Sequence, residues 1–326
     1  MKATALAHAN IAIVKFWGVL DADLNLPLND SLSLTLDQAD TVVTVEFSPH
    51  VAEDRVELDG LPAPDLARQR VVRHLDRLRA LAHEGAPARV AARSTFPAAT
   101  GLASSASLFA GLTVAGLAAL GISTDRRTAS TIARLGSGSA ARSLPGGWAY
   151  WQAAARHEDS YAFQFRPADW WPLRDVLVIV SEEPKESPSL AGHLAAPSSP
   201  CHAGRLGAVG EHLALARTAL EMRDLALLGR VAEEEALLLH AVAMTARPPA
   251  LYWHPATVEV LRQVRRWREE GRPVYYTLDA GPNVHLLTDA EHAPALAADV
   301  CRLPGVQRTI VCQPGGPPVL GDVHLF

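Results

Sequence analysis

The aspartate in the stretch YTLDAGPN is a candidate for proton transfer. Asp279 ends an apolar run that is typical of a buried strand, and Gly281 and Pro282 follow it as a tight turn. A carboxylate held at the end of a strand can accept a proton from a substrate. The same residue type also forms turns, so this stretch alone favours a structural role over a general base.

The stretch FPAATGLASSAS, residues 96–107, has almost no large side chains. It lies between a strand-type run and a helix-type run, and N–H groups at the start of a helix bind anions when small residues let a phosphate approach. Close packing between helices is the alternative explanation for these small residues. The predicted phosphate-binding set is Gly101, Leu102, Ala103, Ser104, Ser105 and Ser107, with Ser105 also a candidate to reach a metal ion bound to the phosphate.

A second loop, GSGSAARS, spans residues 136–143. Ser137, Ser139 and Arg142 would suit an anion, because arginine offers a planar fork to phosphate or carboxylate. The loop also matches the dinucleotide pattern G-x-G-x-x-A, but it follows a helix-type run where that pattern requires a strand. A nicotinamide oxidoreductase therefore requires a strand before Gly136. A glycine-rich turn with a surface arginine is the remaining alternative.

The elements that must position these residues alternate between strand and helix patterns. The first half contains several strand-type runs, an amphipathic helix predicted over residues 63–83, and a short helix with Asp125 as its N-cap. The second half predicts helices over about 203–225, 227–243, 255–270 and 289–302. A Pro/Ser-rich connection over 184–202 favours a lobe boundary there. We predict an α+β protein with lobes 1–183 and 184–326.

Composition excludes several classes of protein. The 326 residues carry a formal net charge of −5, which argues against nucleic-acid and anionic-membrane partners. Three widely spaced cysteines indicate neither a disulfide framework nor a zinc site. No run approaches the roughly 18 apolar residues of a membrane span. We therefore expect a soluble, cytoplasmic protein.

Three motifs in this order, NIAIVKFWG, FPAATGLASSA and LDAGPN, resemble the galactokinase, homoserine kinase, mevalonate kinase and phosphomevalonate kinase (GHMP kinase) superfamily. Within it, the full chain is similar to the mevalonate diphosphate decarboxylase family. The resemblance implies a two-lobed GHMP kinase fold, with a ribosomal-protein-like N-terminal lobe, a ferredoxin-like C-terminal lobe and the active site in the cleft between them. It also implies a homodimer and an ATP- and Mg²⁺-dependent reaction. That reaction phosphorylates a tertiary hydroxyl and then releases phosphate and carbon dioxide.

The resemblance assigns roles to individual residues. Asp279 would accept the hydroxyl proton, and Lys15 would keep Asp279 ionised. Arg142 would grip the substrate carboxylate or phosphate. The predicted substrate-binding set is Asn10, Phe16, Trp17, Ser137, Ser139 and Arg142, although Trp17 also suits a core position. His240 is expected to pack in the core and not to bind a ligand.

The chain departs from the family pattern where the distal phosphate of the substrate binds. The family signature K-Y-W-G-K is KFWGV here, so that Phe16 and Val19 replace a tyrosine and a lysine. Residues 186–192, ESPSLAG, lack the arginine of a Ser-Ser-Arg stretch that many bacterial members carry. We predict mevalonate 5-phosphate as the substrate and isopentenyl phosphate as the product, since an unpaired buried phosphate is strongly unfavourable. The alternatives are a diphosphate held by Lys185 or Arg142, a GHMP kinase without decarboxylation, and a non-catalytic binding module.

Overall fold

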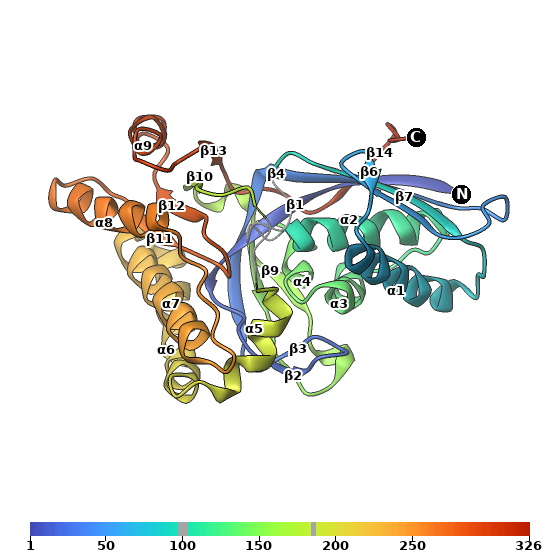
Figure 1. Cartoon of the computed structure of the whole chain (residues 1–326), viewed down its shortest axis with the longest axis horizontal. Coiled ribbons are helices and arrows are strands. Elements are labelled where there is room, and N and C mark those ends of the chain that lie inside the picture. Colours follow the sequence, from blue (N-terminus) through green and yellow to red (C-terminus); the bar gives the residue numbers. More distant parts are fainter. Residues whose placement is uncertain (97–103, 184–186) are drawn as a thin grey trace.

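A computed structural model describes residues 1–96, 104–183 and 187–326 (Figure 1). The predicted phosphate-site residues Gly101, Leu102 and Ala103 lie outside these ranges, as does Lys185. Among the described helices, none combines the length and the hydropathy that a membrane crossing needs.

The first sheet is built on two long antiparallel strands, β1 (Lys2–Val14) and β4 (Ser31–Phe47). Within the described residues it has eight strands, in the order β14-β1-β4-β7-β5-β6, with β8 pairing to β4 and β9 to β8. Its other strands are β5 (Arg55–Leu58), β6 (Leu61–Pro62), β7 (Ala88–Ser94), β8 (Trp148–Trp151), β9 (Ala162–Arg166) and β14 (Val319–Gly321). A small hairpin of β2 (Val19–Asp21) and β3 (Leu26–Pro27) follows β1.

Three helices pack on this sheet: α1 (Asp65–Ala82), α2 (Ser104–Ala119) and α3 (Arg126–Gly136). The helix predicted over 63–83 is confirmed as α1, which buries Val71, Leu75 and Leu78. The apolar spacing also predicts Leu81 on this face, but Leu81 is 52% exposed in the last turn. The predicted N-cap of α3 is also confirmed, because the Asp125 carboxylate accepts a hydrogen bond from the Thr128 N–H at 2.7 Å.

The second sheet has the strand order β11-β12-β10-β13, with every neighbouring pair antiparallel. Its strands are β10 (Arg174–Ile179), β11 (Tyr275–Thr277), β12 (Val284–Thr288) and β13 (Arg308–Cys312). The helices of this half are α6 (His202–Met222), α7 (Leu225–Thr245), α8 (Pro255–Glu269) and α9 (Ala293–Val300). They agree with the four predicted helices, except that α9 is shorter at its start than expected.

The two sheets do not divide at residue 183. Strand β10 precedes that position yet belongs to the second sheet, and β14 returns from the C-terminus to pair with β1. The Pro/Ser-rich segment marks a connection, whereas the crossing between sheets depends on strand pairing, which composition does not reveal. The ends of β1 and β4 also share one buried core with α6 and α7.

Two short helices lie in segments that the sequence analysis treats as loops. They are α4 (Ala140–Ser143) in the Gly/Ser-rich loop and α5 (Ser189–Ala195) in the Pro/Ser-rich connection. Both are too short to show an amphipathic period. Single 3₁₀ turns occur at η1 (His157–Asp159), η2 (Ala168–Trp170) and η3 (Ala196–Ser198).

Candidate active site

An ion pair between Lys15 and Asp279 joins the two sheets. Lys15 follows the last residue of β1, and Asp279 lies two residues beyond β11. The Lys15 ammonium donates to Asp279 Oδ1 at 2.8 Å and to the Ala12 carbonyl at 2.7 Å. The Lys15 side chain is 1% exposed and that of Asp279 is 21% exposed. A buried cation therefore holds a carboxylate that solvent and small molecules can still reach.

Each member of this pair changes the protonation of the other. Burial alone would raise the pKa of Asp279, but the Lys15 ammonium and the Arg142 guanidinium together bring that pKa below its ordinary value. Burial lowers the pKa of Lys15, and the attraction of Asp279 opposes this change. Asp279 is thus an ionised carboxylate that is ready to accept a proton.

Arg142, on α4, is a buried cation with neutral partners. Its side chain donates to Ser31 Oγ at 2.8 Å and to Asn10 Oδ1 at 3.2 Å, and its guanidinium lies 5.7 Å from the ring centroid of Trp151. Burial lowers the pKa of Arg142 to about 10, so the group stays protonated at neutral pH. It forms no ion pair within the described parts of the chain, and a buried cation of this kind suits a bound anion.

A row of hydroxyl groups connects the start of α2 to Arg142. Ser105 Oγ lies 3.0 Å from Ser137 Oγ, which in turn lies 3.4 Å from Ser139 Oγ. The Ser139 carbonyl accepts a hydrogen bond from Asn10 Nδ2 at 3.1 Å, and Asn10 contacts Arg142 through its other amide atom. The structure therefore brings together five of the predicted site residues from three separate segments.

Ser107 does not lie at this surface. It is fully buried, and its hydroxyl lies 2.7 Å from Thr41 Oγ1 on β4, where it joins α2 to the sheet. Ser104 and Ser105, the first two residues of α2, are only partly buried, unlike Ser107. A phosphate site here would therefore use the hydroxyls of Ser104 and Ser105.

The rest of α2 explains why its residues are small. A Cβ added at Gly111 would lie 2.8 Å from Val43, and one added at Gly116 would lie 2.5 Å from Leu78. The sheet and α1 are therefore in direct contact with the backbone of this helix. The close-packing alternative holds for the body of α2, whereas the phosphate prediction concerns only its first turn.

The two aromatic residues after Lys15 differ in their surroundings. The Phe16 ring lies 4.7 Å from Trp151 and 4.2 Å from His193, measured between ring centroids. Trp17 is 1% exposed and packs in an apolar cluster that includes Leu239. This packing of Trp17 supports the core alternative. Phe16 instead lies against Trp151, whose ring the Arg142 guanidinium also faces.

The Gly/Ser-rich loop does not have the context of a dinucleotide site. Helix α3, and not a strand, runs up to Gly136, as the sequence analysis expects. A Cβ at Gly136 would lie 2.1 Å from Phe109, so this glycine permits close packing. A nicotinamide oxidoreductase requires a strand before Gly136, and this segment is helix α3.

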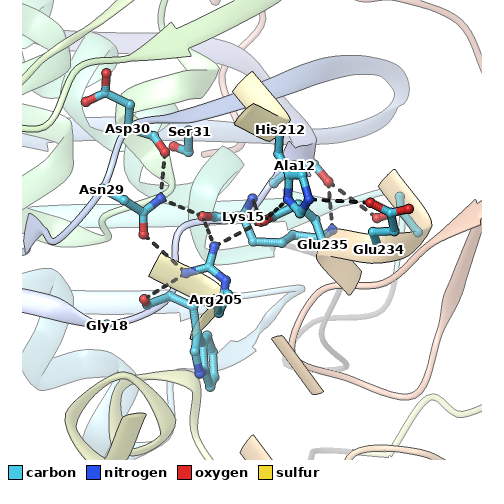
Figure 2. A network of polar contacts seen from close by, with 12 residues as sticks. Ala12, Lys15, Gly18, Asn29, Asp30, Ser31, Arg205, His212, Glu234 and Glu235 are labelled. Atoms are coloured by element: carbon cyan, nitrogen blue, oxygen red, sulfur yellow. Dashed lines mark hydrogen bonds and ion pairs between the residues drawn. The ribbon is translucent and has the colours of Figure 1, made fainter. Parts of the chain in front are cut away.

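A buried polar network that was not predicted from the sequence surrounds the Lys15 backbone; it is formed by Glu235, Arg205, His212 and Asn29 (Figure 2). Glu235 belongs to a run of three glutamates that suggests an exposed surface. A signal was nevertheless available, because Glu235 has the helical spacing of the apolar residues Leu228, Val231 and Leu239. A charged residue on the apolar face of a helix requires a buried partner.

Comparison with known proteins gives matches along most of the chain. Residues 7–162 match the diphosphomevalonate decarboxylase-like N-terminal domain, and residues 176–316 match the mevalonate 5-diphosphate decarboxylase C-terminal domain. The chain is 37% identical to the diphosphomevalonate decarboxylase mvd1 of Aspergillus fumigatus, over 86% of this chain and 75% of the fungal protein.

Two further similarities extend over nearly the full length. The chain is 33% identical to the phosphomevalonate decarboxylase of Haloferax volcanii, with 97% of each protein covered. Among solved structures, MDDEF in complex with MVAPP, AMPPCP and magnesium is 33% identical, covers 99% of each chain and has a TM-score of 0.93. The described architecture is therefore shared with that solved structure.

Proposed function

The chain belongs to the diphosphomevalonate decarboxylase family, and we propose that it converts mevalonate 5-phosphate and ATP to isopentenyl phosphate, carbon dioxide, ADP and phosphate. The observation that carries this proposal is the ion pair between Lys15 and the partly exposed Asp279. Close to it lies Arg142, a buried cation that forms no ion pair within the described chain. The pair offers a base for a hydroxyl, and Arg142 offers a partner for an acidic substrate.

Asp279 is the proposed base for the first step. A tertiary alcohol is a poor nucleophile, so its proton must leave as its oxygen bonds to the γ-phosphorus of ATP. That proton passes to Asp279 Oδ, while the bond from the γ-phosphorus to the bridging oxygen breaks and releases ADP. Lys15 keeps Asp279 ionised beforehand and offsets negative charge near the transferred group.

Decarboxylation follows from loss of the new phosphate ester. Phosphate departs with the electron pair of the carbon–oxygen bond, and the bond to the carboxylate carbon then supplies the electrons of the new double bond. Carbon dioxide is released, so atoms and charge balance. Arg142 and Asn10 would hold the acidic substrate in line for these steps, because orientation contributes much of the rate in such reactions.

The residues present fit a magnesium ion that arrives with ATP. The first turn of α2 supplies hydroxyl oxygens from Ser104 and Ser105, which are hard donors of the type that Mg²⁺ prefers. In the described ranges, no group of three or more His, Cys, Asp or Glu side chains forms a metal site by itself. Bound there, the ion would neutralise phosphate charge during transfer.

The choice of the monophosphate is supported by the aromatic residues near Arg142. Phe16 brings an apolar ring there, packed at a tilt against Trp151 and His193, where the family signature has a tyrosine. Two of the nearby cations already pair with carboxylates of the protein: Lys15 with Asp279, and Arg205 with Glu235. The haloarchaeal phosphomevalonate decarboxylase, similar over 97% of its length, is a precedent for such a substrate.

Mevalonate 5-diphosphate is the second candidate substrate, because the fungal relative is a diphosphomevalonate decarboxylase and the solved complex contains MVAPP. A direct comparison separates the two. The protein is incubated with ATP, Mg²⁺ and either mevalonate 5-phosphate or its diphosphate, and carbon dioxide release is measured over a range of concentrations. We expect a higher kcat/KM for the monophosphate, and a higher kcat/KM for the diphosphate would contradict the proposal.

A further inference from the structure

We propose that Glu235 is a positioning residue, which fixes the main chain of Lys15 so that the Lys15 ammonium meets Asp279. The inference rests on the proposed function, because it concerns the same ion pair. Glu235 lies on α7 and contacts the Lys15 backbone, whereas Asp279 contacts the Lys15 ammonium, and Glu235 takes no part in proton transfer itself. It acts through Lys15.

Both polar groups of the Lys15 backbone are held by this network (Figure 2). Glu235 Oε2 accepts the Lys15 N–H at 2.8 Å. The Lys15 carbonyl accepts from Arg205 Nη2 at 2.6 Å and from Asn29 Nδ2 at 3.0 Å. Glu235 Oε2 also accepts from Arg205 Nη2 at 2.9 Å, which closes a ring of contacts around this one residue. The main chain after β1 is thereby fixed by side chains and not by strand pairing.

Glu235 remains charged in this buried position. Its side chain and that of Arg205 have no exposed surface. Burial would raise the pKa of Glu235, but hydrogen bonds and charge from His212 and Arg205 bring it below the ordinary value. His212 Nδ1 lies 2.8 Å from Glu235 Oε1, and this contact raises the pKa of His212. Arg205 and His212 thus stabilise the charged form of the Glu235 carboxylate.

The same helix also reaches Asp279. His240, five residues after Glu235 on α7, is 1% exposed and forms a hydrogen bond with the backbone of Asp279. Burial, with a smaller effect of Lys15, lowers the pKa of His240 to about 3, so the ring is neutral. Helix α7 therefore contacts the backbone of each partner and sets the distance between them.

A purely stabilising role is the competing explanation for Glu235, and it makes a different prediction. Removing one partner of a buried pair is destabilising, whereas replacing both partners by apolar residues is often neutral or stabilising. A double variant, Arg205→Met with Glu235→Leu, should therefore restore stability without restoring the hydrogen bonds to Lys15. Activity and stability would recover together only if the network served stability alone.

The test compares wild type, Glu235→Gln, the double variant and the control Glu270→Gln, whose side chain is 58% exposed just after α8 and outside the network. In Glu235→Gln and in the double variant we expect kcat for carbon dioxide release to fall about ten- to a hundredfold, with KM for both substrates changed less than about threefold. The acidic limb of the pH–rate profile should move to higher pH, because a displaced Lys15 no longer lowers the pKa of Asp279. The control should match wild type.

Two outcomes would overturn the inference: an unchanged kcat and acidic limb in a folded Glu235→Gln, or wild-type kcat in the double variant. A carboxyl ¹³C NMR titration of Asp279 in wild type and the variants gives a readout that needs no substrate. If wild type releases no carbon dioxide from either mevalonate phosphate, the proposed function fails, while the titration still tests Glu235. The expected result is a higher Asp279 pKa in both variants, and an unchanged value would contradict the inference.

Discussion

At the scale of single residues, Lys15 and Asp279 depend on one another. Asp279 is useful as a base only when it is ionised, and the Lys15 ammonium at 2.8 Å lowers its pKa despite the burial that would raise it. Removing the Lys15 charge leaves burial as the main effect on Asp279. The carboxylate would then stay protonated up to a higher pH.

The first prediction follows from this dependence. Activity requires ionised Asp279, so it is present above the pKa of that group and is lost as pH falls through it. In Lys15→Gln the pKa rises, and the acidic limb of kcat/KM should move to higher pH along with a large loss of rate. The control is Lys2→Gln, whose ammonium contacts the Phe326 carbonyl at 3.0 Å on the far end of β1. An acidic limb that stays in place in Lys15→Gln would argue against the ion pair as the source of the lowered pKa.

A second prediction concerns the substrate. Phe16→Tyr with Val19→Lys adds the hydroxyl and the cation that the family signature has at these positions, so it should raise kcat/KM for the diphosphate relative to the monophosphate. An added charge–phosphate hydrogen bond is worth about 1.5–3 kcal/mol, or roughly ten- to a hundredfold. Leu20→Lys is the matched control, because it places the same charge one residue further along, on a side chain that is 55% exposed. Equal effects of the two changes would indicate a general effect of net charge.

At the scale of elements, α2 has two separate tasks. Its first turn carries Ser104 and Ser105 at the candidate phosphate site, and its body packs glycine directly against β4 and α1. Small residues serve both tasks, for different reasons. Substitutions in the two parts should therefore have different consequences.

The third prediction separates these tasks. Gly111→Ala should destabilise the protein by about 1–3 kcal/mol, because the new methyl group would meet the stiff Val43 side chain at 2.8 Å. KM for ATP should change little. Gly204→Ala in α6 is the matched control: nothing lies within 4 Å of its Cβ position, so it should stabilise by about 0.5–1 kcal/mol. Urea unfolding and ATP-dependent kinetics measure both effects, and a stable Gly111→Ala would contradict the packing described for α2.

Elements with a long period or a clear terminal signal could be predicted from the sequence. The helix of residues 65–82 and the Asp125 cap fall in this class. Asp279 ends a strand-type run, but its role as a base and its pairing with Lys15 are expected only from the family resemblance. The helices over 140–143 and 189–195 could not, since four and seven residues are too few to show a helical period. Strand β14 is short and exposed, so its pairing with β1 has no pattern in the sequence.

The buried network shows a second reason for failure. Glu235 was missed because three consecutive glutamates suggest a solvated surface, and Arg205 because its partner lies 30 residues away in sequence. Pairing of buried charges is decided by tertiary contacts, which local propensity does not contain. The apolar spacing around Glu235 was the one local indication.

At the scale of the whole molecule, the two sheets are joined by shared packing and polar contacts. The ends of β1 and β4 share a core with α6 and α7, β14 carries the C-terminal segment back to the first sheet, and the Lys15 network joins the two halves. Unfolding one half would expose the apolar surface that it covers on the other. The two family domains are therefore separate in sequence but pack together through one shared core.

The fourth prediction is a single unfolding transition. Thermal melts followed by circular dichroism and by tryptophan fluorescence should coincide, because Trp148 reports on the shared core and Trp267 on the core of the second sheet. The calorimetric and van't Hoff enthalpies should also agree. Two separated transitions would show that the halves are independent and that the shared core contributes little.

The most direct test of the central claim is a single-turnover measurement with carboxyl-labelled mevalonate 5-phosphate, ATP and Mg²⁺. Wild type should release labelled carbon dioxide and ADP in equal amounts. Asp279→Asn should release both at least about a hundredfold more slowly, since general-base catalysis contributes roughly that much or more. Asp289→Asn, at a side chain that is 43% exposed, should behave as wild type. Wild-type turnover by Asp279→Asn, or ADP formed without carbon dioxide by the native protein, would contradict the account.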